Sequence, residues 1–385
     1  MQTPIFLILL GSRSEAFAAA PLIEQIRQVE NKLPFLLRVI TTGQEDTELE
    51  QALMTLHIKP NARYYTKTSR LADARLDAAL LETVESILRH YAPTAVLAAR
   101  QGATAWAAAT AAYFKHVPFL HLGAGDAWAD KTQRPFPEWF HTPDITRMSS
   151  VHICNNSTCK NSIQQSPEGI LPNATTCVTG NGADEVLART LEQLTSAEPP
   201  LDPTLKIFQR DQAPVLAFLA RREHHADALR PLCWALDAVS QAHAEHNFVM
   251  LHSLQSYICD ALVSLVPRRE NIHDISPLPY PAFVRELRRS RLVITDSARL
   301  AQEALLLRRP LLLIGAYADT ESLRALAAET GQTYRVVPME KETLENAINE
   351  TLAAPTPDAA PERLEVAPAG KPTFDAILKW WRDIK

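Results

Sequence analysis

Short runs of apolar residues alternate with longer amphipathic segments along most of the chain. Ile5–Leu10, Leu36–Thr41 and Ala95–Ala99 are apolar runs of strand length. Glu15–Val29 instead places its apolar residues three and four positions apart, which is the period of a helix with one buried face. Strands separated by helices form βαβ units, whose parallel sheet is covered by helices on both faces. The pattern therefore predicts an α/β protein.

The same alternation continues through the first half of the chain. Further helices are predicted at Glu48–Leu56, Asp73–His90 and Ala103–Phe114, and further strands at Phe119–Leu122, Val151–Asn155 and Thr176–Val178. Around Ser196–Pro203 the composition changes to a proline-rich break, which is typical of a linker. We expect an N-terminal Rossmann-like domain over residues 1–198.

A second series of strands and helices follows this break. Strands are predicted at Val215–Phe218, Phe248–Leu251, Ile272–Ile275, Leu292–Thr295 and Leu311–Ile314, and helices at Asp227–His243, Tyr280–Arg289 and Arg299–Leu307. The pattern predicts a second Rossmann-like domain over residues 199–368, with a surface excursion at Ala353–Lys371 and a final helix at Phe374–Trp380. Two consecutive doubly wound domains favour a ligand at the carboxyl ends of the strands, in a crevice between the domains.

Composition narrows the class of partner. Of 385 residues, 46% are hydrophobic and 22% charged, the net charge is −5, and the sequence pI is about 6.2. This balance gives no bulk attraction to nucleic acid or to an anionic membrane surface. The apolar run at Ile5–Leu10 is much too short for a membrane span and has no basic segment before it, so we expect no membrane span and no signal peptide.

The cysteines point to a reducing compartment. Five are scattered along the chain without CxxC pairs or a neighbouring histidine pattern: Cys154, Cys159, Cys177, Cys233 and Cys259. This spacing disfavours a disulfide framework and a structural zinc site built on these thiols. We expect a cytoplasmic protein with free thiols.

Seven short motifs stand in order between roughly residues 5 and 315. They are Gly11-Ser12-Arg13-Ser14-Glu15-Ala16 with Ala20-Pro21-Leu22, Thr42-Gly43-Gln44, His121-Leu122-Gly123-Ala124-Gly125, Arg134-Pro135-Phe136-Pro137-Glu138, Val178-Thr179-Gly180-Asn181, Ala220-Arg221-Arg222-Glu223, and Thr295-Asp296-Ser297 with Gln302-Glu303. Their order and spacing resemble those of the non-hydrolysing UDP-N-acetylglucosamine 2-epimerase family.

The resemblance implies a GT-B architecture, in which two Rossmann-like domains face each other across a cleft. It implies that the second domain binds the nucleotide and that a C-terminal helix, residues 369–385, crosses back to pack on the first domain. It also implies a UDP-sugar ligand resembling UDP-N-acetylglucosamine, no cofactor, no metal, and a homodimer formed through the first domain. It identifies no acceptor.

The sequence departs from the family at the residues that move protons. The family's reaction is implied to be elimination of UDP and its re-addition with inversion at C2, which needs positioned acids and bases. The positions of a family aspartate, glutamate and histidine are here Gln101, Gly123 and Ala220. An amide and a methyl group do not exchange protons at neutral pH, and glycine has no side chain. We therefore do not expect the parental epimerisation to carry over unchanged.

Three residues are candidates for the missing proton chemistry. Glu138 matches a family glutamate and lies in an aromatic segment, although it could equally pair with Arg134. Asp126 lies three residues after Gly123, and His224 four residues after Ala220. Other histidines are alternatives: His121, His141 and His225. For each of these groups an ordinary structural or surface role is the competing interpretation.

Five residues are candidates for ligand binding. Arg13 and the start of the helix after it could contact a diphosphate, or Arg13 could be a surface residue. Ser297 could cap its helix and at the same time present backbone amides to phosphate. The resemblance implies that Glu303 binds the ribose of the nucleotide. The competing interpretation is that Glu303 is a solvated helix residue. The family's glycine pair after this serine is replaced by Ala298-Arg299, so Arg299 would supply a compensating charge. Arg221 is a further cation.

Three functions remain open on the sequence alone. The chain could be a divergent epimerase-like isomerase, a glycosyltransferase of the same architecture, or a non-catalytic protein that binds a sugar nucleotide. The glycosyltransferase alternative is supported because the residues expected to bind the nucleotide match the family better than the residues expected to act at C2. Breakage of the C2–H bond separates the first function from the other two.

Overall fold

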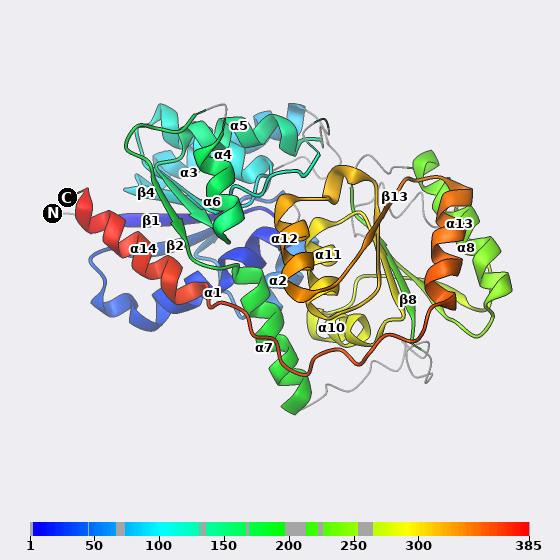
Figure 1. Ribbon diagram of the computed structural model, residues 1–385. Coiled ribbons are helices and arrows are strands. Elements are labelled where there is room, and N and C mark those ends of the chain that lie inside the picture. The colour runs from blue at the N-terminus through cyan, green and yellow to red at the C-terminus, as the bar shows by residue number, and fades with distance from the viewer. Residues whose placement is uncertain are drawn as a thin grey trace. The chain divides into compact units, whose positions relative to one another are not determined.

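The computed structural model describes residues 3–44, 46–66, 74–130, 132, 136–166, 169–196, 213–221, 226–252 and 265–384 (Figure 1). The chain divides into two compact units. The first comprises residues 1–127, 134–186 and 366–385, and the second comprises residues 128–133 and 187–365. Each unit contains its own parallel sheet and its own core. Among the described helices, none combines the length and the apolarity needed to cross a bilayer.

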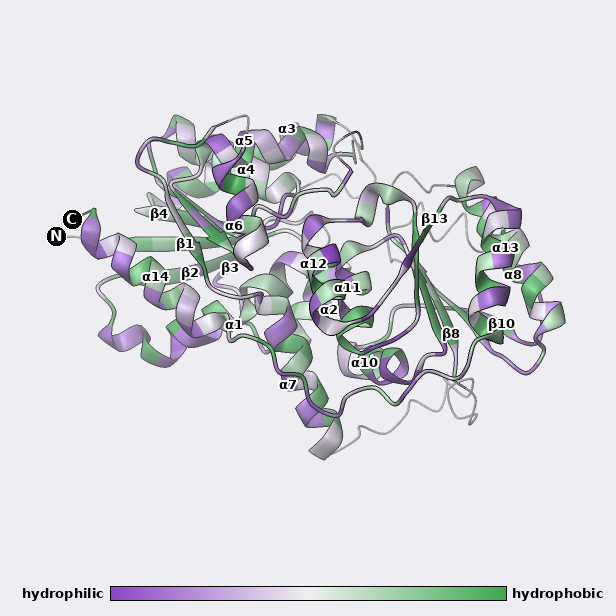
Figure 2. Ribbon diagram, viewed as in Figure 1, coloured by the Kyte–Doolittle hydropathy of each residue, from purple (hydrophilic) through white to green (hydrophobic). Residues whose placement is uncertain are grey.

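The first unit is built on a parallel sheet of strand order β3-β2-β1-β4-β5-β6-β7. Its strands are β1 (Ile5–Leu10), β2 (Leu36–Thr41), β3 (Ala62–Arg63), β4 (Ala95–Ala99), β5 (Phe119–Ala124), β6 (Val151–Cys154) and β7 (Thr175–Val178). The central strands are buried on both faces, which explains why they read as continuous apolar runs rather than as an alternating pattern. In Figure 2 these strands are hydrophobic along most of their length.

Helices connect the strands of the first unit. They are α1 (Arg13–Val29), α2 (Asp46–Thr55), α3 (Ala74–Tyr91), α4 (Ala103–Phe114), α5 (Glu138–Met148), α6 (Ser157–Gln164), α7 (Gly182–Ser196), which continues into the second unit, and α14 (Gly370–Asp383), with a short 3₁₀ turn, η1 (Glu30–Lys32). Helix α4 is mostly alanine and most of its residues are buried. Its small side chains let the helix lie close to the sheet and pack against α3 and α5.

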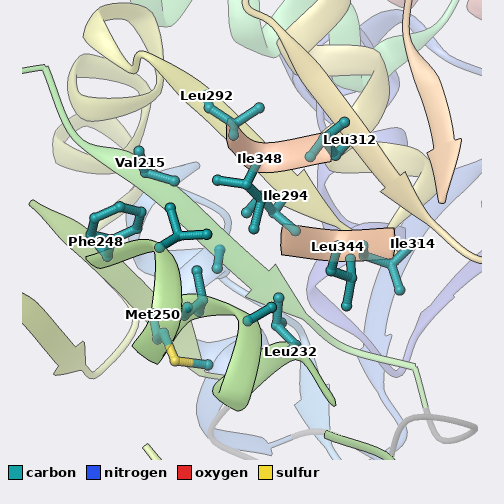
Figure 3. Close-up of a cluster of buried hydrophobic side chains, with 14 of the residues drawn as sticks. Val215, Leu232, Phe248, Met250, Leu292, Ile294, Leu312, Ile314, Leu344 and Ile348 are labelled. Carbon is teal, nitrogen blue, oxygen red and sulfur yellow. The ribbon is translucent and has the colours of Figure 1, made fainter. Parts of the chain in front are cut away.

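The second unit repeats this plan with strand order β10-β9-β8-β11-β12-β13. Its strands are β8 (Val215–Leu219), β9 (Phe248–His252), β10 (Ile272–Ile275), β11 (Leu292–Thr295), β12 (Leu311–Ile314) and β13 (Arg335–Val337). Its described helices include α8 (Arg230–Ala242), α10 (Tyr280–Arg289), α11 (Ala298–Leu306), α12 (Glu321–Thr330) and α13 (Lys341–Ala353), with 3₁₀ turns η4 (Ala226–Leu229) and η5 (Ala316–Ala318). Figure 3 shows side chains of four strands and of α8 and α13 converging in its core.

The structure confirms the strands predicted from the apolar runs, with ends that differ by one or two residues. The pattern did not predict two short strands, β3 and β13, or the helices α5, α6, α7, α12 and α13. The strands β3 and β13 have only two and three residues, too few for a recognisable pattern, and α5 has mixed polarity and an internal proline. The proline-rich segment 197–203 lies outside the described residues.

The C-terminal helix α14 belongs to the first unit and packs beside α1 (Figure 1). Trp381 is 5% exposed, and its ring meets Phe6 of β1 edge-on at 5.2 Å, while Phe6 stacks on Phe35 at 4.1 Å. Glu185 of α7 accepts hydrogen bonds from the backbone N–H groups of Ala369 and Gly370 at the start of α14. The helix is therefore fixed both by aromatic packing and by a carboxylate at its N-terminus.

We expect Trp381→Ala to destabilise the first unit by about 3–5 kcal/mol, because it leaves a cavity against Phe6. The matched control is Trp234→Ala, which removes the same side chain from a position that is 54% exposed. Denaturant unfolding followed by circular dichroism measures both. Equal losses of stability in the two variants would contradict the packing described for α14.

Candidate functional site

The carboxyl ends of β1, β2 and β4 carry a compact polar cluster in the first unit. Thr104 donates to the side-chain oxygen of Gln44 at 2.8 Å, and its hydroxyl lies 3.2 Å from that of Thr42. Gly11 follows β1, and a Cβ atom at this position would lie 1.9 Å from the Thr104 hydroxyl and 2.7 Å from that of Thr42. Only glycine fits here, so the first loop of the unit approaches its neighbours very closely.

Glu15 lies at the start of α1, beside this cluster, and the sequence identifies it only as part of a motif. Its Oε2 accepts the backbone N–H of Gly11 at 2.6 Å, and its own N–H donates to Ser12 Oγ, which caps α1. The side chain is buried, and this burial raises its pKa to about 7, against the opposing effects of the Gly11 and Ser12 hydrogen bonds and the Arg100 charge. Glu15 therefore changes protonation near neutral pH.

A second interaction holds the end of β4. Arg100 adopts φ +67°, a left-handed conformation that is unusual for arginine, and its carbonyl lies 2.6 Å from His121 Nε2. Burial lowers the pKa of His121 to about 3, so the ring is neutral and Nε2–H donates to this carbonyl. The next residue, Gln101, donates its side-chain amide to the carbonyl of Asp126 at 3.1 Å. His121 and Gln101 thus position the loops after β4 and β5.

The first-unit candidates are only partly brought together. Asp126 lies beside Gln101, as its backbone contact shows. Arg13 is the first residue of α1, with its guanidinium carbon 5.5 Å from the ring centre of Phe17, and Glu138 is the first residue of α5. Arg134, His224 and His225 lie outside the described residues.

His141 packs between helices of the first unit. Its side chain is buried, its Nε2 lies 3.0 Å from Asp77 Oδ2, and its ring stacks on Trp106 at 5.5 Å. Trp106 in turn donates its indole N–H to Asp144. These contacts tie α3, α4 and α5 together, so His141 serves packing of the helices.

The second unit places the motif Thr295-Asp296-Ser297 around one buried carboxylate, that of Asp296. Asp296 follows β11 and is completely buried, and it accepts the backbone N–H groups of Ala220 at 2.8 Å and Arg221 at 3.1 Å. These residues follow β8, the strand beside β11. Ser297 caps α11 by accepting the N–H of Leu300. The end of β8 and the N-terminus of α11 are therefore held at fixed positions.

Arg299 and Glu303, both predicted as ligand-binding residues, form a pair on successive turns of α11. The guanidinium donates to Glu303 Oε1 at 2.8 Å, and the same oxygen accepts the hydroxyl of Tyr280 at 2.7 Å. Glu303 and Tyr280 are both buried. Burial, chiefly, and the Glu303 charge raise the pKa of Tyr280 well above its usual value, so its hydroxyl stays a donor. Tyr280 was missed, because a tyrosine at a helix start carries no distinctive sequence signal.

Arg221 completes this group. Its guanidinium carbon lies 5.8 Å from the ring centre of Tyr317, in the 3₁₀ turn η5 that follows β12. The carboxyl edge of the second sheet thus presents Arg221 near the N-terminus of a capped helix, and both attract anions. Such a combination can bind a phosphate or diphosphate group.

Comparison with known proteins places this arrangement in a family. A sequence model of UDP-N-acetylglucosamine 2-epimerases matches residues 27–368. A probable UDP-N-acetylglucosamine 2-epimerase of Ralstonia nicotianae is 27% identical over 334 residues, and the match covers 86% of each chain. The UDP-N-acetylglucosamine 2-epimerase of Neisseria meningitidis serogroup A is 24% identical over 326 residues, covering 84% of this chain and 85% of that protein.

Solved structures show the same fold. The N. meningitidis UDP-GlcNAc 2-epimerase bound to UDP-GlcNAc has a TM-score of 0.80 at 22% identity, with 97% of this chain and 100% of that chain covered. The Methanocaldococcus jannaschii enzyme in complex with UDP-GlcNAc and UDP has a TM-score of 0.76 at 19% identity, with 98% and 99% covered. The predicted fold, two Rossmann-like α/β units of the GT-B class, is confirmed.

We expect Glu15→Gln to change how stability depends on pH. Between pH 4.5 and 7 the native state binds the Glu15 proton more tightly than the unfolded chain, so the free energy of unfolding falls as pH rises. We subtract the free energy of unfolding of the variant from that of the wild type. This difference should be roughly 2–3 kcal/mol lower at pH 8 than at pH 5. Glutamine keeps an acceptor for the Gly11 N–H.

Urea unfolding at the two pH values tests this prediction, with Glu24→Gln on the exposed face of α1 as the control. The pKa values of His121 and His152 are lowered in the native state, so these histidines make the native state more stable above pH 6.5 than below it. This effect is the same in wild type and variant and therefore cancels when their free energies of unfolding are subtracted. If wild type and Glu15→Gln differ in stability by the same amount at pH 5 and at pH 8, the Glu15 carboxyl is not buried as described.

Proposed function

This chain belongs to the UDP-N-acetylglucosamine 2-epimerase family, and we propose that it binds a UDP-sugar of the UDP-N-acetylglucosamine kind. The observation that carries the proposal is the group at the carboxyl edge of the second sheet, where Arg221 lies next to the capped N-terminus of α11. Relatives of the same fold are known bound to UDP-GlcNAc and UDP. In this proposal the second unit holds the nucleotide.

The diphosphate is bound, we propose, by backbone N–H groups at the start of α11 together with Arg221. The first N–H groups of a helix have no partner within the helix, and the helix dipole adds a partial positive charge there. Ser297 occupies the cap, and the next residues are Ala298 and Arg299. The Arg299 guanidinium is joined to Glu303, so part of its charge is already balanced by the protein.

Glu303 is proposed to accept hydrogen bonds from the ribose. Its Oε1 is held by Arg299 and by Tyr280, so the carboxylate is fixed before any ligand binds. A fixed acceptor loses little conformational entropy on binding and therefore supports affinity. Arg13, at the start of α1 in the first unit, is kept as a candidate contact for the ligand.

The parental proton chemistry is not part of the proposal. Gln101 donates its amide to the Asp126 carbonyl, Gly123 has no side chain and adopts φ +72°, and Ala220 has only a methyl group. In the first unit we keep Asp126 and Glu138 as candidate carboxylates. Loss of a positioned acid or base lowers rates by about 10²–10⁴-fold.

Glycosyl transfer is the second candidate function. A transferase needs a nucleotide clamp and one base for an acceptor hydroxyl, and it does not need to break the C2–H bond. The second unit keeps Arg221, Ser297 and Glu303 for such a clamp, with Ala298-Arg299 in place of a glycine pair, whereas the positions for C2 chemistry are changed. This contrast favours transfer, or binding alone, over epimerisation.

Association into a homodimer through the first unit is also proposed. Aromatic side chains are exposed at the end of α4, where Tyr113 and Phe114 are 54% and 75% exposed, and at the start of α5, where Trp139 and Phe140 are 46% and 56% exposed. Exposed apolar area of this kind is typical of a protein interface. A solution mass equal to one chain would contradict this part of the proposal.

We expect Arg221→Gln to weaken UDP binding by about 10–100-fold, the usual effect of losing a charged hydrogen bond to an anion. Binding of uridine, which carries no phosphate, should change much less. Isothermal titration with both ligands measures the contrast, and Arg335→Gln on β13, an exposed arginine paired with Glu350, is the control. Equal losses for UDP and uridine would exclude a role of Arg221 at the diphosphate.

We expect no exchange at C2 when the protein is incubated with UDP-GlcNAc in D₂O, because the acid and base positions are changed. Proton NMR of the recovered sugar nucleotide measures this directly, under conditions where titration shows the site to be saturated. Deuterium at C2 would instead establish epimerase chemistry with relocated groups. UDP release that depends on an added acceptor would establish transfer.

A further inference from the structure

The turn between α8 and β9 gathers two imidazoles and a carboxylate. Donor atoms of His243, Glu245 and His246 all lie within 4.8 Å of one another. Glu245 Oε1 is 3.3 Å from His243 Nδ1 and 3.7 Å from His246 Nε2. We propose that these three residues bind a Zn²⁺ ion.

This site is remote from the nucleotide-binding residues of the same unit. His243 caps the C-terminus of α8, and His246 precedes β9, which begins at Phe248. The cluster therefore lies at the amino-terminal edge of the second sheet. Arg221 and Ser297 follow the carboxyl ends of β8 and β11, at the opposite edge. The metal would accordingly stabilise the fold and take no part in chemistry on a sugar nucleotide.

The backbone of the turn is held in place before a metal binds. The N–H of His246 donates to the carbonyl of His243 at 3.1 Å. The side-chain amide of Asn271 donates to the carbonyls of Ser240, His243 and His246, at 3.0, 3.4 and 3.2 Å. Because these bonds fix both histidine backbones, little conformational entropy is lost when the side chains bind an ion.

His243 also has the second interaction that metal-binding histidines usually make. Its Nε2 lies 3.0 Å from Oδ1 of Asn349 on α13. When Nε2–H donates to this oxygen, Nδ1 carries the lone pair and turns it towards the Glu245 carboxylate. A lone pair and a carboxylate oxygen 3.3 Å apart repel each other unless a cation or a proton lies between them. Zn²⁺ satisfies both groups.

The distances suit tetrahedral zinc. Zn–N distances of about 2.0–2.1 Å and Zn–O distances of about 2.0–2.2 Å place neighbouring ligand atoms roughly 3.3–3.5 Å apart. The two measured separations to Glu245 are close to this value, and the Glu245 side chain is 61% exposed and can adjust. Solvent can supply a fourth ligand. Two imidazoles and one carboxylate suit zinc, whereas Mg²⁺ and Ca²⁺ prefer six or more oxygens.

The surrounding charges are compatible with a bound cation. Arg291 is the nearby cation, but its guanidinium donates to the carbonyls of Thr351, Leu352 and Ala354 at the end of α13. These carbonyls offset part of its charge.

The test uses the full chain without a histidine tag, stripped with a chelator and titrated with Zn²⁺ against a chromophoric competitor. We expect one tightly bound ion per chain. His243→Ala and His246→Ala should each weaken binding by more than the roughly 10–100-fold expected for Asn349→Ala, which removes an outer partner. His90→Ala, at an exposed position on α3, should leave the affinity unchanged.

Two further measurements keep the proposal testable if a histidine variant folds poorly. Glu245→Gln alters the exposed ligand and should also weaken Zn²⁺ binding. Co²⁺ should give the intense visible bands of a four-coordinate site in the wild type and not in His246→Ala. No stoichiometric Zn²⁺ binding, or binding that survives both histidine substitutions, would overturn the proposal. UDP binding should be the same with and without zinc, so this test is independent of the proposed function.

Discussion

A buried carboxylate that accepts backbone N–H groups organises the functional edge of each unit. In the second unit Asp296 binds the amides of Ala220 and Arg221. In the first unit Glu15 binds the amide of Gly11. In both cases the amides follow the first strand of the unit, β1 or β8, near the middle of its sheet. A buried carboxylate is costly unless it is hydrogen-bonded, so these chain segments have little freedom to move.

This constraint fixes the carboxyl edges of both sheets through contacts with the backbone. The loops at the carboxyl ends of the strands are held by backbone contacts from Asp296, Glu15 and His121. None of these contacts depends on the side chain of Gln101 or Ala220, or on Gly123. Gln101 adds a further hydrogen bond, from its side-chain amide to the loop after β5.

The sequence was sufficient for the fold. Continuous apolar runs identify buried parallel strands, and the motif around Ser297 predicts the helix cap. The ion pair between Arg299 and Glu303 was not predicted, although both residues were candidates for ligand binding. What escaped prediction depends on contacts between distant segments. Tyr280 reaches Glu303 across 23 positions, and His243 reaches Asn349 across 106, so neither has a local pattern. The raised pKa of Glu15 likewise follows from burial that only the folded chain creates.

The central claim is that the second unit holds the nucleotide at the carboxyl ends of β8 and β11. A crystal structure of the protein with UDP-GlcNAc tests it most directly. We expect diphosphate oxygens within hydrogen-bond distance of Arg221 and of the first N–H groups of α11, and the ribose hydroxyls within hydrogen-bond distance of Glu303. Ligand density elsewhere on the chain, with Arg221 and Glu303 unoccupied, would contradict it.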